Sequence, residues 1–327
     1  MKAMVLEKVG SPLQLKELPK PVPEKDQILI RTQACAVCRT DLHIMDGELP
    51  AKKLPLILGH QVVGIIEEVG SEVSNFSFGD IVGVPWLGKT CGQCKFCLSD
   101  RENLCDNALY TGYTLNGGFA EYCVAYPDFC FPIHGSVSAA HAAPYLCGGL
   151  IGFRAYRMTG EAKKIGFYGF GSSAHMLIQL AVFEKKEVYA FTRHGDNEGQ
   201  DFAKKLGAIW AGNSSDMAPE LLDAAIIFAP VGSLVPTALR AVDKGGVVVC
   251  AGIHMSDIPA FPYEILWGEK VLRSVSNLTR LDGNEFLDFA EGIPIKTEIS
   301  TYTLEQANRA LDDVRRGNLQ GTAVIIL

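Results

Sequence analysis

Residues 164–192 read KIGFYGFGSSAHMLIQLAVFEKKEVYAFT, and their pattern sets the fold class. An apolar strand is followed by the spacing Gly-x-Gly-x-x-Ala at Gly169, Gly171 and Ala174, then by an apolar helix and a second strand. In this context the first glycine permits a tight turn, the second admits a pyrophosphate to the backbone, and the third position packs the helix against the strand. The stretch therefore predicts a dinucleotide-binding unit.

Strands and helices continue to alternate after this unit. A helical pattern at 196–208 precedes an apolar strand-like run at 223–230, and a second helical pattern at 233–242 precedes another such run at 245–252. Strands of a parallel sheet that is buried on both faces have such short apolar runs, with helices between them. We therefore expect an α/β fold with a doubly wound parallel sheet over residues 148–276.

The N-terminal part of the chain has a different sequence pattern. Residues 1–135 contain short alternating apolar runs between Gly and Pro residues, which predict a barrel-like β domain with few helices. Helical spacing and small residues follow from Ser138 to Gly160. Beyond Asn277, two helical stretches and the apolar strand 322–327 predict that the chain returns to its first domain. The expected domains are therefore a discontinuous β-rich domain, 1–147 and 277–327, and a dinucleotide-binding domain, 148–276.

Composition and charge exclude several classes of protein. The 327 residues, 48% hydrophobic and 20% charged, suit a globular enzyme of two domains. The net charge of −7 argues against nucleic acid as a partner. No apolar run reaches the length of about 18 residues that spans a membrane. The N-terminus does not read as an export signal, so we expect a cytoplasmic protein whose cysteines stay reduced.

Four cysteines form a cluster with the spacing of a metal site. Cys91, Cys94, Cys97 and Cys105 follow the pattern C-x2-C-x2-C-x7-C in a lobe over about 91–105. Four thiolates can close a tetrahedron around one zinc ion and leave no open position, so this site would be structural. An iron–sulfur cluster is the rival interpretation, but ferredoxin runs continue with a shorter spacing and then Cys-Pro.

A second set of polar residues lies in the segment 35–64, CAVCRTDLHIMDGELPAKKLPLILGHQVVG. Cys38 and His60 are ligands suited to zinc. Thr40 and His43 could pass a proton from one to the other. A buried segment normally avoids so many polar groups unless chemistry requires them.

These motifs together resemble the zinc-dependent medium-chain alcohol dehydrogenases, and the resemblance covers essentially the whole chain. It is carried by the CRTDLH run, by GHxxxG at Gly59–Gly64, by the four-cysteine lobe, by Cys147 and by the glycine turn at Gly169. It implies a GroES-like β-rich catalytic domain and a Rossmann domain, with the active site in the cleft between them. It also implies two zinc ions per chain, with the catalytic zinc held by Cys38, His60 and Cys147.

The resemblance also implies roles for the residues around Cys38. Two thiolates and an imidazole leave one position of the zinc open, where an alcohol would bind and lose its proton to form an alkoxide. Thr40 would accept that proton and His43 would pass it to solvent. Asp41 would fix the tautomer of His60, and Arg39 would bind the cofactor pyrophosphate.

One residue departs from the family pattern. The residue after the zinc histidine is usually glutamate, which is thought to approach the metal transiently, and here it is Gln61. An uncharged amide is a poorer zinc ligand. We therefore hypothesise that Gln61 leaves the chemistry intact but slows ligand exchange or changes the affinity for zinc.

The end of the second strand of the dinucleotide-binding unit bears on cofactor choice. NAD-selective sites place Asp or Glu there to bind the ribose 2′-hydroxyl, but this chain has Thr192 and Arg193. These two residues, with His194, could instead bind a 2′-phosphate. We expect NADP to be preferred, with use of either cofactor as the alternative.

The expected substrate is a small to medium primary alcohol or its aldehyde. Thr40, Trp86 and Leu87 are predicted to line the pocket, with Tyr110 or Leu115 as further candidates. Two alternatives stay open: a zinc dehydrogenase that acts on a polyol or an aromatic aldehyde, and a non-catalytic zinc- or nucleotide-binding relative. By the resemblance, we also expect a homo-oligomer, either a tetramer or a dimer.

Overall fold

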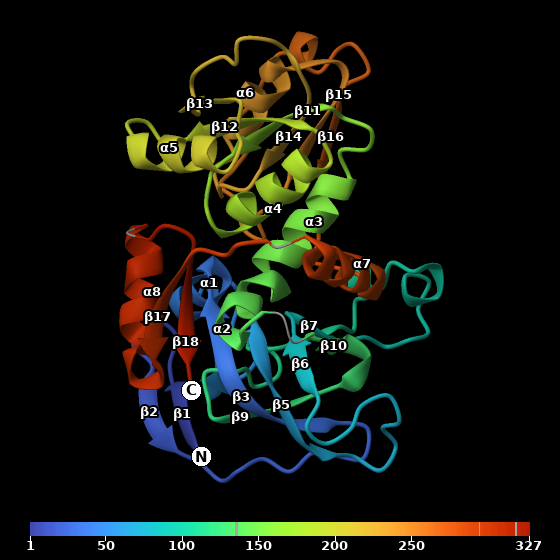
Figure 1. Ribbon diagram of the computed structural model, residues 1–327, viewed down its shortest axis with the longest axis vertical. Helices are drawn as coiled ribbons and strands as arrows, with labels where there is room; N and C mark the ends of the chain where they lie inside the picture. The colour runs from blue at the N-terminus through green and yellow to red at the C-terminus, as the bar shows by residue number, and fades with distance from the viewer. Residues whose placement is uncertain (135–136, 294, 318) are drawn as a thin grey trace. The chain divides into compact units, whose positions relative to one another are not determined.

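The computed structural model describes residues 1–134, 137–293, 295–317 and 319–327. These residues form two compact units (Figure 1). Unit 1 comprises Met1–Cys147, Asn277–Gly292 and Lys296–Leu327, and unit 2 comprises Gly148–Ser276 and Ile293–Ile295.

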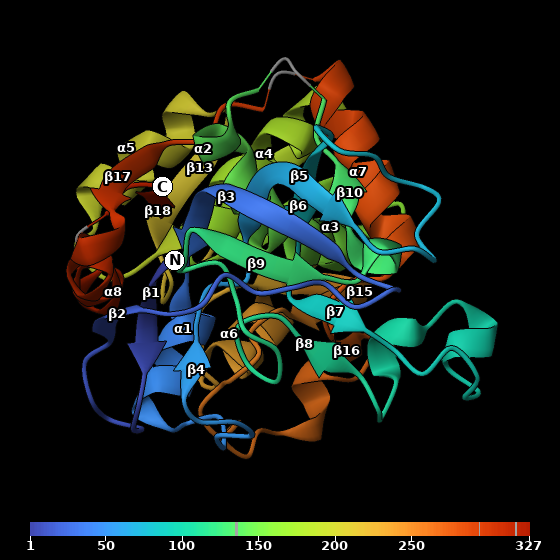
Figure 2. The ribbon, with the colours of Figure 1, turned by 90° about the horizontal axis from the view of Figure 1, so that it is seen from below.

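Unit 1 is built around a curved sheet whose central strand is β3. Within the described residues its order is β10-β6-β5-β3-β18-β17, and β9 also pairs with β3 (Figure 2). The strands are β3 (Ile28–Val37), β5 (Val62–Val69), β6 (Ile81–Val84), β9 (Tyr122–Ala125), β10 (Phe131–Pro132), β17 (Ile299–Thr303) and β18 (Thr322–Ile326). Because β18 pairs with β3, the last strand of the chain joins a sheet whose other strands include β3, β5 and β6 from the N-terminal part of the sequence.

Two smaller sheets and several short helices complete unit 1. One sheet has the order β2-β1-β4 and the other pairs β7 with β8. Their strands are β1 (Lys2–Leu6), β2 (Gln14–Glu17), β4 (Leu56–Ile57), β7 (Leu87–Lys89) and β8 (Leu109–Tyr110). The α-helices are α1 (Arg39–Asp46), α2 (Ala139–Ala142), α7 (Arg280–Gly292) and α8 (Ala307–Arg316). The 3-10 turns are η1 (Cys97–Ser99), η2 (Glu102–Leu104), η3 (Pro127–Phe129), η4 (Ala143–Leu146) and η6 (Leu304–Gln306).

Unit 2 contains a sheet of parallel strands in the order β13-β12-β11-β14-β15-β16. The strands are β11 (Lys164–Tyr168), β12 (Glu187–Thr192), β13 (Trp210–Asn213), β14 (Leu222–Ile227), β15 (Val242–Cys250) and β16 (Val271–Ser274). The helices are α3 (Gly148–Arg157), α4 (Ser172–Phe183), α5 (Asn197–Lys205) and α6 (Leu234–Ala241), with the 3-10 turn η5 (Tyr263–Ile265). The sequence order reverses at β11, whose neighbours are β12 and β14, and this is the point where such sheets bind ligands.

The helical pattern that the sequence shows from Ser138 to Gly160 is not one helix. It is divided into α2, η4 and α3. Pro144 lacks the N–H that a continuous α-helix needs, and Cys147 has φ −134° and ψ −70°, outside the helical region. The break separates Cys147 from the helices on either side, so this residue stands in an irregular segment of the backbone.

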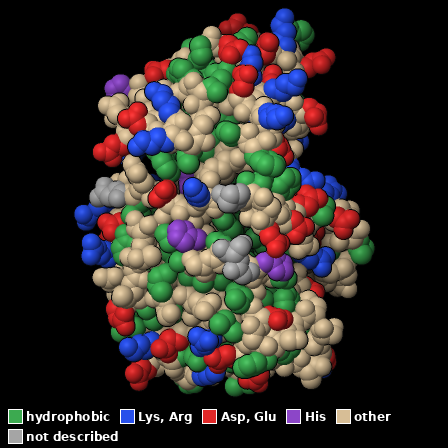
Figure 3. Space-filling view, viewed as in Figure 1, with side chains coloured by type: hydrophobic (Ala, Val, Ile, Leu, Met, Phe, Trp, Pro, Cys, Tyr) green, Lys and Arg blue, Asp and Glu red, His purple; other side chains and the backbone are tan. Residues whose placement is uncertain are grey.

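The surface shows no large region of one charge on the face in Figure 3, where Lys and Arg side chains are interspersed with Asp and Glu. Within the described residues, no helix has both the length and the hydropathy needed to cross a membrane.

Candidate active site

Cys38, His60 and Cys147 meet in unit 1 although they are far apart in the sequence. The Cys38 sulfur lies 3.2 Å from Nε2 of His60 and 4.0 Å from the Cys147 sulfur. All three ligand atoms lie within 4.8 Å of one another. Cys38 precedes α1, His60 lies between β4 and β5, and Cys147 follows η4. The structure therefore brings together the three residues proposed from sequence as ligands of a catalytic metal.

The start of α1 holds Cys38 and Asp41 in place. Cys38 is the N-cap, and its sulfur accepts a hydrogen bond from the Thr40 N–H at 3.3 Å. Asp41 returns a bond, because its Oδ2 accepts from the Cys38 N–H at 3.0 Å. This reciprocal capping satisfies N–H groups that have no partner within the helix, and the positive end of the helix dipole favours a thiolate at Cys38.

Asp41 also orients His60. Its Oδ1 accepts hydrogen bonds from Nδ1 of His60 at 3.1 Å and from the Gly59 N–H at 3.2 Å, and both side chains are fully buried. Because Nδ1 donates to Asp41, Nε2 is the ring nitrogen that faces the Cys38 sulfur, and loss of its proton would present a lone pair to a metal. A carboxylate behind a metal-binding histidine fixes its tautomer in this way.

The charges within this group favour a dication. The hydrogen bond from the Cys147 thiol, with the charge of His60, lowers the pKa of Cys38 well below its usual value, while the same thiolate and burial raise the pKa of Cys147. Burial acts to lower the pKa of His60, but the charges of Asp41 and Cys38 outweigh it and raise the pKa to about 10. A metal ion would displace the remaining protons, so its uptake releases protons.

The donor set and the spacing fit zinc. Ligands at about 2.3 Å from zinc in a tetrahedron lie about 3.8 Å from one another, and nitrogen sits slightly closer. The separations of 4.0 Å between the sulfurs and 3.2 Å between sulfur and nitrogen are near these values.

The proton-carrying residues predicted from sequence lie on α1. Thr40 and His43 are both buried and are three residues apart, so they share one face of the helix. The structure adds a residue that the sequence did not indicate, because Nδ1 of His43 contacts Oε2 of Glu48. The one sequence signal for this pairing is an acidic residue just beyond a glycine that ends the helix.

Aromatic rings form a wall beside His60. The edge of the His60 ring faces Trp86, with ring centroids 5.1 Å apart. Trp86 in turn stacks on Tyr110 and Tyr113, at centroid distances of 5.2 Å and 5.6 Å. Leu87, also predicted to line the pocket, is fully buried at the start of β7. Tyr113 was not predicted, although it lies near Tyr110 in the sequence.

Gln61 is buried and follows His60, one of the three candidate metal ligands, in the sequence. Its side-chain nitrogen Nε2 has no hydrogen-bond partner within the described residues. A buried amide nitrogen without a partner costs free energy, of the order of 1–3 kcal/mol.

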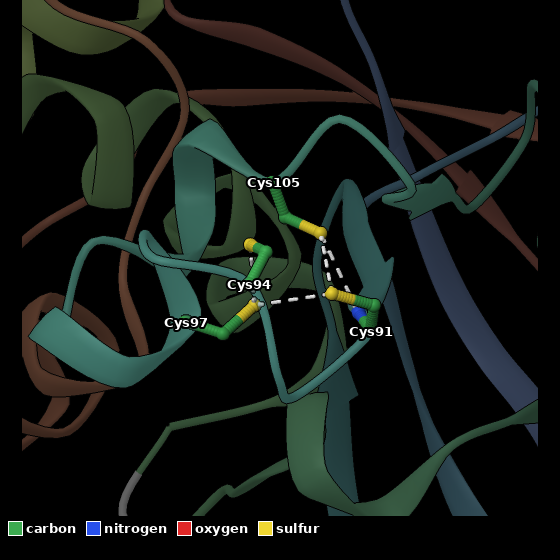
Figure 4. A group of neighbouring side chains, drawn as sticks. All are labelled: Cys91, Cys94, Cys97 and Cys105. Atoms are coloured by element: carbon green, nitrogen blue, oxygen red, sulfur yellow. Dashed lines mark hydrogen bonds between the residues drawn. The ribbon is translucent and has the colours of Figure 1, made fainter.

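The four cysteines of the lobe also converge on one point, as Figure 4 shows. The sulfurs of Cys91 and Cys97 lie 3.9 Å apart, and those of Cys94–Cys97 and Cys105–Cys91 lie 3.5 Å apart. These distances again match the edges of a zinc tetrahedron. The N–H groups of Gln93 and Cys94 lower the pKa of Cys91 to about 6, which favours the thiolate that zinc requires.

The glycine turn of unit 2 has the geometry that its sequence suggests. Gly169 follows β11 with φ +93°, and a Cβ there would lie 3.1 Å from Cβ and N of Ala229. At Gly171, the N-cap of α4, a Cβ would meet nothing within 4 Å, so the backbone is open to a ligand. Ala174 lies in the first turn of α4 and is fully buried.

The residues predicted to select the cofactor differ in exposure. Thr192 ends β12 and is buried, with its hydroxyl donating to the Gly212 carbonyl at 3.4 Å and accepting from Gln200 at 3.2 Å. Arg193 is exposed. Arg39, the predicted pyrophosphate ligand, is also exposed, at the first position of α1.

Comparison with known proteins identifies the family. A model of the alcohol dehydrogenase GroES-like domain matches residues 24–135. The probable alcohol dehydrogenase AdhA of Mycobacterium tuberculosis is 42% identical over 318 residues, which cover 95% of this chain and 91% of that protein. This chain belongs to the zinc-dependent medium-chain alcohol dehydrogenase family. An alcohol dehydrogenase of Geobacillus stearothermophilus is 37% identical and covers 99% of each chain.

A solved alcohol dehydrogenase shares the fold. The thermostable alcohol dehydrogenase of Pyrobaculum aerophilum, with cobalt and zinc bound, matches with a TM-score of 0.91 at 24% identity and covers 100% of this chain and 99% of that chain. The predicted fold class, with a GroES-like part and a parallel-sheet Rossmann part, is therefore confirmed. The predicted enzyme class is confirmed as well: this medium-chain alcohol dehydrogenase is an oxidoreductase.

Proposed function

We propose that this enzyme transfers a hydride reversibly between a small to medium primary alcohol and a nicotinamide cofactor, at a zinc ion held by Cys38, His60 and Cys147. The observation that carries the proposal is the convergence of these two thiols and one imidazole, with Thr40 and His43 on the adjoining helix. Three protein ligands are the number that catalytic zinc sites use. When bound, the zinc supplies a Lewis acid that makes an alcohol hydroxyl more acidic.

The residues of the chain have distinct tasks in this proposal. Asp41 keeps the His60 imidazole in the tautomer that presents Nε2. Thr40 takes the hydroxyl proton of the alcohol, and His43 takes the proton from Thr40. The wall formed by Trp86 and Leu87 excludes water and favours an apolar alcohol chain.

The proposed cofactor is NADP in preference to NAD. The glycine turn of Gly169, Gly171 and Ala174 would hold the pyrophosphate, with Arg39 as an additional cation. Neither Thr192 nor Arg193 carries the carboxylate that repels a 2′-phosphate. Because the Thr192 hydroxyl is bonded within unit 2, Arg193 is the stronger candidate for the phosphate contact.

A double substitution tests the cofactor proposal. Thr192→Asp with Arg193→Ala should shift the ratio of kcat/KM values towards NAD. Arg193→Ala alone should lower kcat/KM for NADP and leave kcat/KM for NAD nearly unchanged. If the double variant keeps the selectivity of the wild-type enzyme, these residues do not select the cofactor.

Gln61 is proposed to tune the catalytic zinc. An amide cannot offer the charged oxygen that glutamate would, so ligand exchange at the metal should be slower. Gln61→Glu should change turnover or the rate at which a chelator removes zinc. An unchanged turnover together with unchanged zinc retention would exclude this role.

The remaining proposals concern the state of the protein. The four-cysteine lobe would hold a second, structural zinc, giving two per chain. The discontinuous domain of 1–147 and 277–327 would be catalytic, and 148–276 would bind the cofactor. A homo-oligomer, a tetramer or a dimer, is proposed, and light scattering of the purified enzyme would measure it. The cytoplasm is the proposed compartment, because a reducing environment protects thiolate ligands, and cell fractionation would test this.

The function itself is tested by an activity assay. Formation of reduced nicotinamide from 1-propanol, with NADP⁺ and NAD⁺ in parallel, should occur with protein that contains two zinc ions. A panel of polyols and aromatic alcohols tests the alternative substrate class. No turnover with any substrate would favour a non-catalytic zinc- or nucleotide-binding protein.

A further inference from the structure

The turn that ends α1 brings Glu48 back onto the relay histidine. Gly47 has φ +84° and its N–H donates to the Ile44 carbonyl at 3.3 Å. A Cβ at Gly47 would lie 2.6 Å from Val9, so the close packing requires glycine here as well. The next residues fold along the helix, and the Leu49 N–H donates to the His43 carbonyl at 3.0 Å. The side chain of Glu48 therefore has a defined place beside His43.

The contact between the two side chains is directional. Oε2 of Glu48 meets Nδ1 of His43, and the imidazole side chain is 9% exposed while the carboxylate is 47% exposed. A carboxylate that is ionised can only accept hydrogen bonds, so Nδ1 of His43 must carry the proton. The lone pair of the ring is then on Nε2, which is the form that can take a proton from elsewhere.

Thr40 precedes His43 on the same face of α1, and both side chains are buried. The short segment 40–48 therefore contains a hydroxyl, an imidazole and a carboxylate in an order that is known from other enzymes that move protons. In such triads the carboxylate orients the imidazole and stabilises the imidazolium, and does not itself take the proton.

Other charged groups on the elements around this turn are engaged elsewhere or lie in solvent. Asp41 binds His60, and Asp46 binds Arg315 of α8 at 2.7 Å and 3.0 Å. Three lysines lie on the adjoining loops: Lys8 and Lys52 are exposed, and Lys53 donates to Asn116 at 2.9 Å. Asp312 of α8 pairs with Arg315. Glu48 is thus the carboxylate in position to act on the relay histidine.

Resting on the function proposed above, we propose that Glu48 is a positioning residue for proton transfer, which fixes the tautomer of His43 and stabilises its protonated form. During alcohol oxidation the hydroxyl proton of the alcohol passes to the Thr40 oxygen as the proton of Thr40 passes to Nε2 of His43. The hydride on the carbinol carbon would go to the oxidised nicotinamide, which would leave the aldehyde and the reduced cofactor. Glu48 stays ionised throughout, and the imidazolium then gives its proton to water. Aldehyde reduction follows the reverse order.

Glu48→Gln tests this role, because it keeps the size and an oxygen acceptor but removes the charge. We expect kcat for 1-propanol oxidation to fall about tenfold with little change in KM, as loss of a charge-assisted hydrogen bond implies. The solvent deuterium isotope effect on kcat should rise, because proton transfer becomes slower. The matched control is Asp46→Asn, which removes the same charge two residues away and should change kcat less than about twofold. A purely structural role would alter thermal stability and not the isotope effect.

A spectroscopic measurement tests the tautomer without turnover. Nitrogen-15 NMR of the zinc-loaded enzyme, with His43→Gln to assign the signals, should show a protonated Nδ1 in the wild type and a mixture of tautomers in Glu48→Gln. A wild-type ring protonated at Nε2 would overturn the proposal, and so would an active Glu48→Gln enzyme with the kcat and isotope effect of the wild type. Absence of turnover in the wild type would instead refute the proposed function, and the NMR result would then decide the role of Glu48 alone.

Discussion

Replacing Asp41 by asparagine should weaken zinc binding at the proposed catalytic site and leave the four-cysteine site unchanged. Asp41 accepts three hydrogen bonds, from Nδ1 of His60 at 3.1 Å and from the N–H groups of Gly59 and Cys38 at 3.2 Å and 3.0 Å. Asparagine has one acceptor oxygen, so its NH₂ group must face at least one of these donors. Depending on which way the amide turns, we therefore expect either the Nδ1 proton of His60 or the Cys38 N–H to lose its acceptor.

The expected loss can be estimated from the contacts. Substitution of a residue that orients a metal ligand lowers metal affinity by about 10- to 100-fold. This corresponds to roughly 1.4–2.7 kcal/mol, about the value of one hydrogen bond to a charged group. Because the side chains of Asp41 and His60 are fully buried, water does not readily replace a lost bond between them, and the upper part of the range is expected if this bond is lost.

Zinc content and a chelator competition measure the effect. The wild type should keep two zinc ions at a chelator concentration that removes one of them from Asp41→Asn. The matched control is Asp282→Asn, since Asp282 is also a buried carboxylate that accepts bonds, from the N–H and hydroxyl of Thr279, but lies outside both cysteine groups. If Asp41→Asn binds both zinc ions as the wild type does, or if the control loses the same ion, the role given to Asp41 is wrong.

Three further predictions follow from other parts of the chain. Burial lowers the pKa of His175 to about 4, so the ring is neutral in the folded protein, and stability falls as the pH drops from about 6.5 to about 4. His175→Leu should remove about 3 kcal/mol of this pH-dependent loss in the free energy of unfolding. Urea unfolding of both proteins at several pH values would measure it, and equal pH dependence in the two proteins would contradict the prediction. Gly171→Ala should keep the Tm and weaken dinucleotide binding in a fluorescence titration. Gly169→Ala should lower both the Tm and the affinity, because only at Gly169 is the new Cβ crowded and φ positive. A Gly171→Ala protein with normal affinity would count against the pyrophosphate site. Cys94→Ser should lower the Tm and remove one zinc while the active-site zinc stays, and loss of both ions would show that the two sites are not independent.

The fold class was accessible from the sequence because its signals are local. The turn at Gly169 lies between an apolar strand and an apolar helix, and the strand predicted at 187–192 is β12. A glycine in a turn motif and a short apolar run each indicate the local conformation of the backbone, without knowledge of distant residues. The spacing of small apolar residues indicated helix between Ser138 and Gly160, but it did not locate the breaks that divide this segment into α2, η4 and α3.

In the candidate site, too, local motifs could be predicted from the sequence and long-range contacts could not. The C-x2-C pattern of the lobe is readable because its ligands are close in sequence, whereas Cys147 lies 109 residues from Cys38 and was reached through the family resemblance. Glu48 was missed because its contact with His43 depends on the left-handed turn at Gly47. The aromatic stack of Trp86 on Tyr110 and Tyr113 depends on the pairing of β7 with β8. Because both strands are very short, the sequence did not predict this pairing.

One measurement tests the central claim most directly: alcohol-dependent formation of reduced nicotinamide by the wild type and by Cys147→Ser, with zinc determined in both samples. We expect turnover in wild-type protein with two zinc ions. We also expect that Cys147→Ser keeps the structural zinc, has the catalytic zinc weakened or absent, and loses turnover in proportion. Full activity in a Cys147→Ser protein that contains one zinc ion would show that the catalytic metal is not held by Cys38, His60 and Cys147.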